Sequence, residues 1–343
     1  MATGRGVRRL ATISDVASMA GVGEATVSRV LNGSTLVREA TRQRVQAAID
    51  ELDYRPSPIA RSLSGGRAMT LGVIAPFFVR PSSVERLQGA EARFTDAGYD
   101  TVLYNVSTPD QRREQFANVA RGRADGILVI SVPPLRREME RLLGSRIPMV
   151  LLDLRHPGLP HVYTDDVEGG RLATGHLLEL GHRRIGFVGD FGDNAYGFTS
   201  SAHRCAGFKE AMRRAALEVP TAYVKEGEHS RSVAMELASE LLGLAEPPTA
   251  IFAASDTQAF GVLEAAVRAG VEVPGRLSVI GFDDIEMAAY TGLTTVRQPL
   301  RYSGARGARL LLDLAEGTPP AQQVSEKLQL DLIVRRTTAS PPN

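Results

Sequence analysis

The sequence contains a single cysteine and no tryptophan, and aromatic residues make up only 6% of its 343 residues. Cys205 alone cannot form a disulfide within the chain, and no cluster of cysteine and histidine has the spacing of a zinc site. No hydrophobic run approaches the roughly 20 residues that a membrane-spanning helix needs. The basic start, Met1 to Leu10, lacks the apolar core of a secretory signal. We therefore expect a cytoplasmic protein without metal, cofactor or membrane partner, in which Cys205 is a small core residue.

Net charge is also small, at +1, but it is unevenly distributed. Residues 1–67 carry ten arginines and six acidic residues, which gives +4, so the remainder of the chain carries −3. A basic segment joined to a near-neutral body is typical of a surface that faces nucleic acid. Arginine also occurs on many solvated surfaces, so charge alone does not decide the function.

The first segment has the hydrophobic spacing of short helices. Three stretches show it, Ile13 to Ala20, Glu24 to Leu31 and Arg42 to Leu52. In a helix-turn-helix, Ala17 allows a close helix crossing, Gly21 supplies the positive φ of the turn and Val27 fills the space between the helices. This spacing alone also fits an ordinary helical hairpin.

From Thr70 onward the pattern alternates between strands and helices. Apolar runs typical of buried strands are Leu71 to Ala75, Thr101 to Tyr104, Gly126 to Ile130, Met149 to Leu152, Ile185 to Val188, Ala250 to Ala253 and Leu277 to Gly281. Helical stretches between them include Val84 to Ala97, Gly169 to Leu180, Arg204 to Ala216 and Gln258 to Ala269. The alternation predicts parallel sheets covered on both faces, with too many units for one small sheet. We expect two lobes, a crossing between them at Tyr163 to Asp166, and a ligand in the cleft.

Several strings of residues closely resemble the LacI/GalR repressor family, over essentially the whole chain. In the first segment they are Thr12 to Ala17, Ala20 to Val22, Ala25 to Gly33, Thr41-Arg42 and Tyr54 to Pro56. Downstream they are Leu71 to Val73, Leu180 to Gly186, Arg204 with Gly207-Phe208, Ser255-Asp256, Ile280 to Asp284 and Leu293 to Pro299. The resemblance implies a homodimeric transcriptional regulator, a repressor, that binds a pseudo-palindromic DNA operator under the control of a small effector, a sugar.

The resemblance also implies the domain organisation. A small all-α helix-turn-helix head would precede an α/β sensor domain of two lobes joined by three crossovers, like that of periplasmic sugar-binding proteins. The expected divisions are 1–56 for the DNA-binding head, 57–67 for a hinge helix and linker, 68–337 for the effector-binding and dimerisation domain, and 338–343 for a C-terminal tail.

The second helix of the head should present its N-terminal end to a major groove. Ala25 suits a thymine methyl, Arg29 a guanine or a phosphate, and Glu24 either a cytosine amine or solvent. Gly23 stands where the family usually has a capping serine, which costs little helix stability but removes a phosphate contact. The other expected DNA-binding residues, several of which suit positioning contacts, are Thr12, Ser14, Thr26, Ser28, Asn32 and Tyr54.

The segment after the head is a candidate hinge helix. Ser57 can cap a helix, Pro58 fits its first turn, and Ile59, Ala60 and Leu63 then share one side. So short a helix is unstable alone in water. The resemblance implies that the partner's hinge helix and the minor groove support it, with Leu63 as a wedge in the central base step. The alternative is a flexible linker.

Candidate effector-binding residues are Phe77, Phe78, Asp153, Arg204, Ser255 and Asp283. The resemblance carries over the carboxylates and the guanidinium, which suit paired hydrogen bonds to adjacent sugar hydroxyls, and the phenylalanines could stack on a sugar ring. Ser255 stands where many members have Asn. We expect Arg204 and Asp283 on facing edges of the cleft, hydrated until an effector desolvates them, and an effector that releases the protein from DNA.

Two other classes of function share parts of this pattern. An exported or cytoplasmic sugar-binding protein would have the lobes without a DNA-binding role, and an exported one needs a signal sequence. An α/β enzyme is disfavoured, because Gly21-Val22-Gly23 follows a helix and lacks a third glycine, and no nucleophile elbow, phosphate loop or metal pair is present. The scattered His176, His182 and His203 fit surface or packing roles better than catalysis.

Overall fold

The structure is a computed structural model that divides into two compact units, Met1–Thr70 and Leu71–Asn343. It describes residues 11–342 except 32–33, 55–67, 77–79, 120, 122–123, 193, 195 and 319–323. The candidate hinge helix lies outside the described residues, and so do the individual predictions for Asn32, Ile59, Ala60, Leu63, Phe77 and Phe78.

The head unit contains three helices, α1 (Ile13–Ala20), α2 (Glu24–Leu31) and α3 (Glu39–Glu51). Thr12 caps α1, because its Oγ1 accepts a hydrogen bond from the Asp15 amide at 3.3 Å while Asp15 Oδ2 accepts from the Thr12 amide at 2.7 Å. Gly21 ends α1 with φ of +64°, in the left-handed region that favours glycine. The turn therefore forms where the sequence predicts it, whereas α3 begins at Glu39 rather than at Arg42.

The three helices enclose one small core. Its buried members are Val16, Ala17, Ala20, Val27, Val30, Val45, Ala48 and Tyr54. Ala17 and Val27 are 5% and 0% exposed, so both take the packing positions expected of them. Truncating a fully buried valine here would cost about 1–3 kcal/mol, much of the stability of so small a unit.

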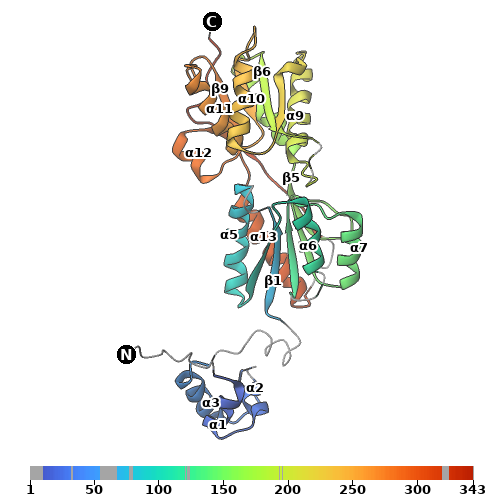
Figure 1. The fold of residues 1–343 in the computed structure, drawn as a ribbon, viewed down its shortest axis with the longest axis vertical. Helices are drawn as coiled ribbons and strands as arrows, with labels where there is room; N and C mark the ends of the chain where they lie inside the picture. The colour runs from blue at the N-terminus through green and yellow to red at the C-terminus, as the bar shows by residue number, and fades with distance from the viewer. Residues whose placement is uncertain are drawn as a thin grey trace, which may run out of the picture. The chain divides into compact units, whose positions relative to one another are not determined.

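The second unit contains two six-stranded sheets, each the centre of a lobe (Figure 1). Lobe 1 holds β1 (Thr70–Ala75), β2 (Asp100–Asn105), β3 (Gly126–Ile130), β4 (Met149–Leu152), β5 (His161–Thr164) and β11 (Ser325–Leu328), in the order β11-β5-β4-β3-β1-β2. Lobe 2 holds β6 (Ile185–Asp190), β7 (Val224–Gly227), β8 (Ala250–Ala253), β9 (Ser278–Asp283), β10 (Thr294–Arg297) and β12 (Asp331–Ile333), in the order β12-β10-β9-β8-β6-β7.

Helices cover both faces of each sheet. Those of lobe 1 are α5 (Pro81–Asp96), α6 (Pro109–Val119), α7 (Arg136–Ser145) and α13 (Leu300–Ala315). Those of lobe 2 are α8 (Asp166–Glu179), α9 (Ser200–Arg214), α10 (Arg231–Leu242), α11 (Asp256–Arg268), α12 (Glu286–Thr291) and the 3₁₀ turn η1 (Thr221–Tyr223). The prediction of parallel sheets in two lobes is thus confirmed. The strands β5, β7, β10, β11 and β12 were not predicted, because their sequences contain no apolar run.

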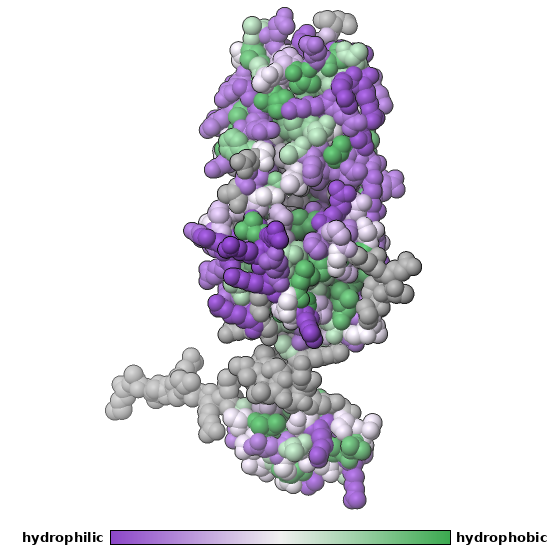
Figure 2. All heavy atoms as spheres, turned by 90° about the vertical axis from the view of Figure 1, so that its right-hand side faces the viewer, coloured by the Kyte–Doolittle hydropathy of each residue, from purple (hydrophilic) through white to green (hydrophobic). Residues whose placement is uncertain are grey.

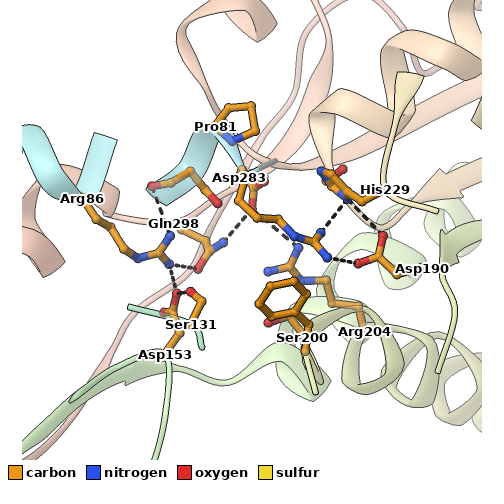
Figure 3. A pocket seen from close by; sticks show the side chains of 14 residues that line it. Pro81, Arg86, Ser131, Asp153, Asp190, Ser200, Arg204, His229, Asp283 and Gln298 are labelled. Carbon is orange, nitrogen blue, oxygen red and sulfur yellow. Dashed lines mark hydrogen bonds and ion pairs between the residues drawn. The ribbon is translucent and has the colours of Figure 1, made fainter. Parts of the chain in front are cut away.

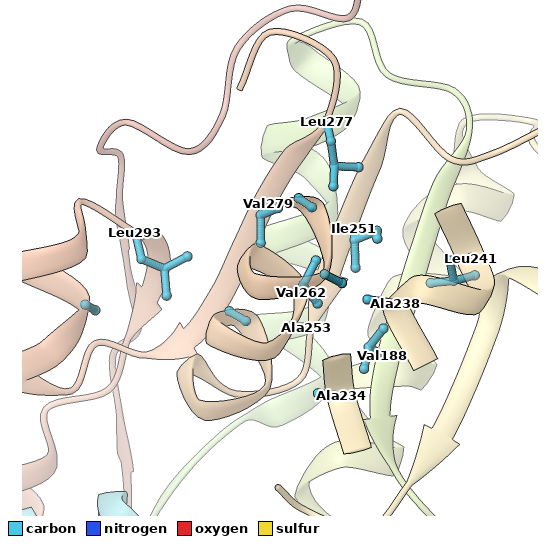
Figure 4. Packing of buried hydrophobic residues seen from close by; sticks show 14 residues of the cluster. Val188, Ala234, Ala238, Leu241, Ile251, Ala253, Val262, Leu277, Val279 and Leu293 are labelled. Carbon is cyan, nitrogen blue, oxygen red and sulfur yellow. The ribbon is translucent and has the colours of Figure 1, made fainter. Parts of the chain in front are cut away.

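The strands of lobe 2 are buried on both faces, because successive side chains point to opposite layers. Ile251 and Ala253 of β8 pack in the cluster beneath α10 and α11, shown in Figure 4, whereas Phe252 between them packs toward α8 and α9. Cys205 lies in that second layer beside Phe208 and is buried, as expected of a core residue.

The chain crosses between the lobes three times, as the family resemblance implies. The first crossing joins β5 to α8 at the predicted Tyr163 to Asp166, the second joins β10 to α13, and the third joins β11 to β12. β10 runs toward lobe 1, because the second crossing follows it. β11 runs parallel to β5, toward lobe 2, and the chain continues in that direction into β12. β12 therefore lies antiparallel to β10.

Lobe 2 extends into the predicted C-terminal tail. Thr338 Oγ1 lies 3.0 Å from His176 Nε2, the Ala339 amide donates to Ser278 Oγ at 3.0 Å, and the Ala339 carbonyl lies 2.9 Å from His182 Nε2. These contacts give His176 and His182 packing roles. They also carry hydrogen-bonded structure past residue 337.

Hydrophilic side chains dominate the visible face of both lobes, with hydrophobic ones in small separate patches (Figure 2). Among the residues that the structure describes, no helix is both long and apolar enough to span a bilayer.

Candidate functional site

A cavity lies between the two lobes, at the carboxyl ends of their parallel strands (Figure 3). Its lining residues are Arg80, Pro81, Ser82, Arg86, Ser131, Asp153, Asp190, Phe198, Ser200, Arg204, His229, Ser255, Asp283 and Gln298. Its side chains leave about 40 Å³ of open space in this arrangement of the lobes, enough for a few water molecules. Four of the six predicted effector-binding residues therefore lie together, and the two phenylalanines lie outside the described residues.

Arg204 and Asp283 both belong to lobe 2, so the expectation that they face each other across the cleft is wrong. Arg204 stands on α9 and Asp283 ends β9, and they are only 7% and 8% exposed. Arg204 Nη1 lies 3.5 Å from Asp283 Oδ1, and Nε donates to Asp166 Oδ1 at 2.8 Å. The expectation that water hydrates both groups is also wrong, because lobe 2 supplies their partners itself.

The protonation of this cluster follows from burial and pairing. Burial alone would lower the pKa of Arg204, but Asp166 and Asp283 outweigh it and raise that pKa. Burial raises the pKa of Asp283, with Arg204 and Arg86 opposing the rise. The guanidinium is therefore permanently charged, and it is the shared counter-charge of two buried carboxylates.

Lobe 1 supplies a second buried pair. Arg86 Nη2 lies 2.6 Å from Asp153 Oδ2, which also accepts from Ser131 Oγ at 2.9 Å. Arg86 also donates to Gln298 Oε1 at 3.0 Å, and Gln298 Nε2 donates to Asp283 Oδ1 at 2.6 Å. A continuous polar network thus joins the two lobes through Gln298 on the second crossing.

Three residues of this polar network have a positive φ although none is glycine. The φ angles are 58° at Ser131, 56° at Asp153 and 113° at Asp283. Each residue lies at or directly after the end of a strand, where the backbone turns its side chain into the cavity. Such conformations cost about 1–3 kcal/mol each and gather at functional sites.

A third cluster directly connects the lobes. Arg80 of lobe 1 lies 2.6 Å from Asp190 Oδ2 of lobe 2 and over the Phe198 ring at 4.6 Å. His229 Nδ1 is 2.5 Å from Arg80 Nη1 and 3.0 Å from Asp190 Oδ1. Burial and Arg80 lower the pKa of His229, so the neutral ring makes one of these two hydrogen bonds at a time.

The pKa of Asp190 is set by the same cluster. Burial alone would raise the pKa of Asp190, but hydrogen bonding from His229 and the charge of Arg80 outweigh it and lower that pKa well below its usual range. Gln258 Nε2 also donates to Asp190 Oδ1, at 3.1 Å. Asp190 is thus ionised at neutral pH.

Aromatic side chains of lobe 2 also reach lobe 1. Phe198 is buried in the lobe 1 core cluster, and Tyr196 stacks on it with ring centroids 5.1 Å apart. Tyr196 donates its hydroxyl to the Ser107 carbonyl at 2.6 Å, and its own carbonyl accepts from Arg112 at 3.2 Å. The cleft is therefore bridged on this side by packing as well as by charge.

The head presents a separate polar surface, on its second helix. Glu24, Ala25 and Arg29 are exposed, and Thr26 and Ser28 are half-buried. Of the residues expected to position the head, Thr12 and Ser14 are exposed, but the Thr12 hydroxyl also donates to Asp15 Oδ2 at 2.7 Å in the helix cap. Tyr54 is 7% exposed and packs in the core, so most of its ring is unavailable to DNA.

Comparisons with known proteins match both the head and the two-lobed unit. Residues 12–57 match the family described as bacterial regulatory proteins, lacI family, and residues 174–338 match the periplasmic binding protein-like domain. The transcriptional repressor PurR of Photobacterium profundum is 32% identical over 335 residues, covering 96% of this chain and 98% of PurR. The chain belongs to the lacI family of bacterial regulatory proteins.

Solved structures extend the likeness to the whole fold of this lacI-family protein. A complex of the transcriptional regulator CelR with cellobiose is 30% identical, with a TM-score of 0.70, and covers 95% of this chain and 99% of CelR. A lac repressor dimer bound to operator and the anti-inducer ONPF is 27% identical, with a TM-score of 0.82, and covers 96% of this chain and all of that one. The protein is therefore a DNA-binding transcriptional regulator with a helix-turn-helix head, as its sequence predicts.

Sequence reasoning missed several residues of this regulator's cavity, namely Arg80, Arg86, Ser131, Asp190, Phe198, His229 and Gln298. Asp190 and Ser131 end or follow strands, so the rule that ligand groups sit at strand ends could have found them. Ser255 was expected and lines the cavity, but its hydroxyl also accepts from the Gln258 amide at 3.2 Å as the cap of α11.

In the described part of the chain, no three His, Cys, Asp or Glu side chains lie close enough together to bind a metal ion.

Glycines bring both buried arginines into place. Gly170 of α8 packs against the backbone carbonyl of Arg204 on α9, and Gly304 of α13 packs against the carbonyl of Arg86 on α5. In each case a Cβ would overlap that carbonyl, so only glycine permits the approach. The two lobes therefore use the same close helix crossing to position their site arginines.

Proposed function

We propose that this protein is a homodimeric repressor whose binding to a pseudo-palindromic operator is controlled by a sugar held between the lobes. The observation that carries the proposal is the cavity in which Asp153 of lobe 1 meets Arg204 and Asp283 of lobe 2. A ligand that contacts both lobes differs in affinity between lobe arrangements, which is what control of a separate DNA-binding head requires.

The unused atoms in the cavity support a polyhydroxyl ligand. Among the described residues, Asp153 Oδ1, Asp283 Oδ2 and Arg204 Nη2 have no hydrogen-bond partner, although the other polar atoms of these side chains are paired. Two acceptors and one donor therefore remain on groups that are already charge-balanced. Neighbouring hydroxyls both donate and accept, so a sugar fits this set.

DNA binding is proposed to use the exposed end of α2. Ala25 and Arg29 would contact base edges or phosphates, and Glu24 either a cytosine amine or solvent. The +4 charge of residues 1–67 supports phosphate contacts, whose counterion release makes affinity fall steeply with salt. We propose that the effector favours the lobe arrangement that releases DNA, as the family resemblance implies.

Two experiments on the full-length protein test the proposal. Selection from a random duplex library should yield a palindromic site, and Arg29→Ala should weaken binding to it about tenfold or more, whereas Arg113→Ala, an exposed change on α6, should not. A thermal-shift panel of sugars should reveal a ligand. A sugar present at about 100 times its dissociation constant raises the free energy of unfolding by roughly 2.7 kcal/mol, and the melting temperature rises with it.

Calorimetry then locates the site. Asp283→Ala should abolish binding of the sugar while DNA binding without the sugar persists. Sugar binding by a protein that selects no duplex would instead indicate a sugar-binding protein without a DNA role. Undiminished sugar affinity in both Asp283→Ala and Arg204→Ala would place the ligand elsewhere.

A further inference from the structure

Arg80 stands at the start of α5 in lobe 1, and its side chain ends in lobe 2. Pro81 occupies the first turn of α5 and fixes the main chain there, and the Arg80 side chain does not cap the helix. It instead contacts three residues that follow strands of lobe 2 or end them, namely Asp190, Phe198 and His229. The contact therefore joins the lobes through one side chain.

These three residues of lobe 2 match the chemistry of a guanidinium group, and we call them the guanidinium socket. Arg80 Nη2 lies 2.6 Å from Asp190 Oδ2, Nη1 lies 2.5 Å from His229 Nδ1, and Cζ lies 4.6 Å from the centroid of the Phe198 ring. A carboxylate, a neutral acceptor and an aromatic face are the partners that suit a planar cation with a fork of donors.

Lobe 2 holds the carboxylate of the socket in place by its own hydrogen bonds. The Asp190 amide donates to Ser201 Oγ at 2.8 Å, and Gln258 Nε2 donates to Asp190 Oδ1 at 3.1 Å. Both partners belong to helices of lobe 2. The position of Asp190 therefore does not depend on lobe 1.

His229 offers Asp190 a second partner, and the two side chains point toward each other in Figure 3. A neutral imidazole carries a proton on one nitrogen only. In one tautomer Nδ1 accepts from Arg80, and in the other it donates to Asp190 Oδ1, 3.0 Å away. The socket thus has one arrangement with Arg80 and one without it, and neither leaves the carboxylate without a hydrogen bond.

Arg80 also takes up room in the cavity between the lobes. It is one of the lining side chains, which together leave about 40 Å³ of open space. One water molecule has a share of about 30 Å³ in the liquid, so a sugar ring needs more room than this. Withdrawal of Arg80 from the socket frees room beside Asp190 and removes a contact between the lobes.

We propose that Asp190, Phe198 and His229 form a guanidinium-binding site of lobe 2 and that Arg80 is its internal ligand. In this role Arg80 is a latch, because it holds the two lobes together and competes with an effector for the same cavity. The inference goes beyond the proposed function, since the latch acts through the chain's own residues and does not depend on what the effector is.

Chemical rescue of the full-length protein tests the latch. Spin labels on Arg113→Cys of lobe 1 and Arg268→Cys of lobe 2 report the distance between the lobes, with labelled chains diluted by unlabelled ones so that each distance arises within one chain. Arg80→Ala should broaden this distance distribution and lower the melting temperature by about 2–4 °C. Methylguanidinium at millimolar concentration, far below the molar range in which guanidinium unfolds proteins, should reverse both changes.

Three controls accompany the rescue. Urea has the planar shape of guanidinium without its charge, so at the same concentration it should reverse neither change. When Arg80→Ala is combined with Asp190→Asn, methylguanidinium should have no effect, because the carboxylate that binds the cation is gone. Arg136→Ala, an exposed change on α7 of lobe 1, should match the parent in both measurements.

The outcomes decide the latch independently of the proposed function. An unchanged distance distribution in Arg80→Ala would show that Arg80 does not hold the lobes together. A change that methylguanidinium fails to reverse, or reverses equally well in combination with Asp190→Asn, would show that the socket is not a guanidinium site. No measurement uses a sugar, so a failed latch leaves the proposed function intact, and a protein that binds no sugar can still have the latch.

Discussion

The two lobes share one strand order but place different chemistry at the cleft. Lobe 2 pairs Arg204 with Asp166 and Asp283, all within the lobe, and these groups are almost fully buried. Lobe 1 instead contributes Arg80 and Arg86, whose partners include groups of lobe 2 or of the second crossing. Lobe 2 therefore holds its ligand groups in a fixed array, whereas the contacts of lobe 1 depend on how the lobes meet.

The difference teaches that similar topology fixes where ligand groups stand but not what they bond to. In both lobes the site carboxylates stand at or directly after strand ends, and in both a glycine of the neighbouring helix packs against the backbone carbonyl of the site arginine. The partners differ because burial inside one lobe requires a complete set of counter-charges, and a group that reaches across the cleft can take them from the other lobe.

Arg204→Ala should break the array of lobe 2 and have the largest effect. It leaves the buried carboxylates of Asp166 and Asp283 without their shared cation, which costs about 3–5 kcal/mol of unfolding free energy. Urea unfolding at neutral pH measures the loss.

Arg171→Ala is the matched control on the adjacent helix. Its pair with Glu210, at 2.9 Å, is partly exposed, so its removal should cost less than about 1 kcal/mol. Equal losses of unfolding free energy in Arg204→Ala and Arg171→Ala would show that the buried ion pairs of lobe 2 stabilise the fold no more than a surface pair does.

Asp190→Asn should weaken the cross-lobe contact with Arg80, by about 1.5–3 kcal/mol at pH 7. The pKa of Asp190 is lowered below its usual 3.8 in the folded state, so its contribution is complete above that pH and is lost as the pH falls toward the lowered value. The stability gap between parent and variant should therefore narrow below pH 3.8, as urea unfolding at several pH values would reveal.

Asp110→Asn provides the comparison for this pH series. Its pair with Arg113 is exposed, so the variant should follow the parent closely across the same range. A gap for Asp190→Asn that stays constant from pH 7 to pH 3 would argue against the ionised cross-lobe contact.

Gly170→Ala and Gly304→Ala should test whether both lobes depend on the same close crossing. Each added methyl meets a backbone carbonyl that cannot rotate away, and overpacking of this kind costs about 1–3 kcal/mol. Thermal or urea unfolding of both variants gives the two costs side by side.

Gly175→Ala, on the same helix as Gly170, has open space around its Cβ. It should raise stability by about 0.5–1 kcal/mol, because alanine loses less backbone freedom on folding. Destabilisation by Gly170→Ala but not by Gly304→Ala would show that only lobe 2 relies on this device.

The sequence predicted Asp153 and Asp283 through the family resemblance, and both stand at the end of a strand. Asp190 also ends a strand but belongs to none of the strings that carry the resemblance, so it was missed. His229 follows β7, whose four residues, Val224–Gly227, have no apolar run. Strand ends are thus predictable to the extent that the strands are buried.

The arginines of α5 could not be found in this way. Arg86 looks like a surface residue of an amphipathic helix, and only the packing of α13 against α5 makes it 1% exposed. The same holds for the assumed hydration of Arg204, since Asp166 and Asp283 lie far from it in sequence. Burial of a charge depends on partners that tertiary structure brings, which periodicity does not reveal.

Tyr196→Phe should have the smallest effect and sharpen the comparison most. It removes the hydrogen bond to the Ser107 carbonyl across the cleft while the ring stays stacked on Phe198, so it should cost about 0.5–1.5 kcal/mol. Tyr223→Phe removes a bond of similar length, 2.7 Å, to the Glu246 carbonyl within lobe 2, and should cost about as much.

The two tyrosine variants should differ in geometry, not in stability. Spin labels at the exposed Arg113 of lobe 1 and Arg268 of lobe 2 report the distance between lobes, and Cys205 is buried away from the label. Because, of these two hydroxyls, the Tyr196 hydroxyl bonds across the cleft and the Tyr223 hydroxyl bonds within lobe 2, Tyr196→Phe should broaden that distance distribution and Tyr223→Phe should leave it as in the parent. Identical distributions in both variants would mean that the packing of Phe198, the Arg80 contact and the Arg112 bond to the Tyr196 carbonyl hold the lobes together on this side without the hydroxyl.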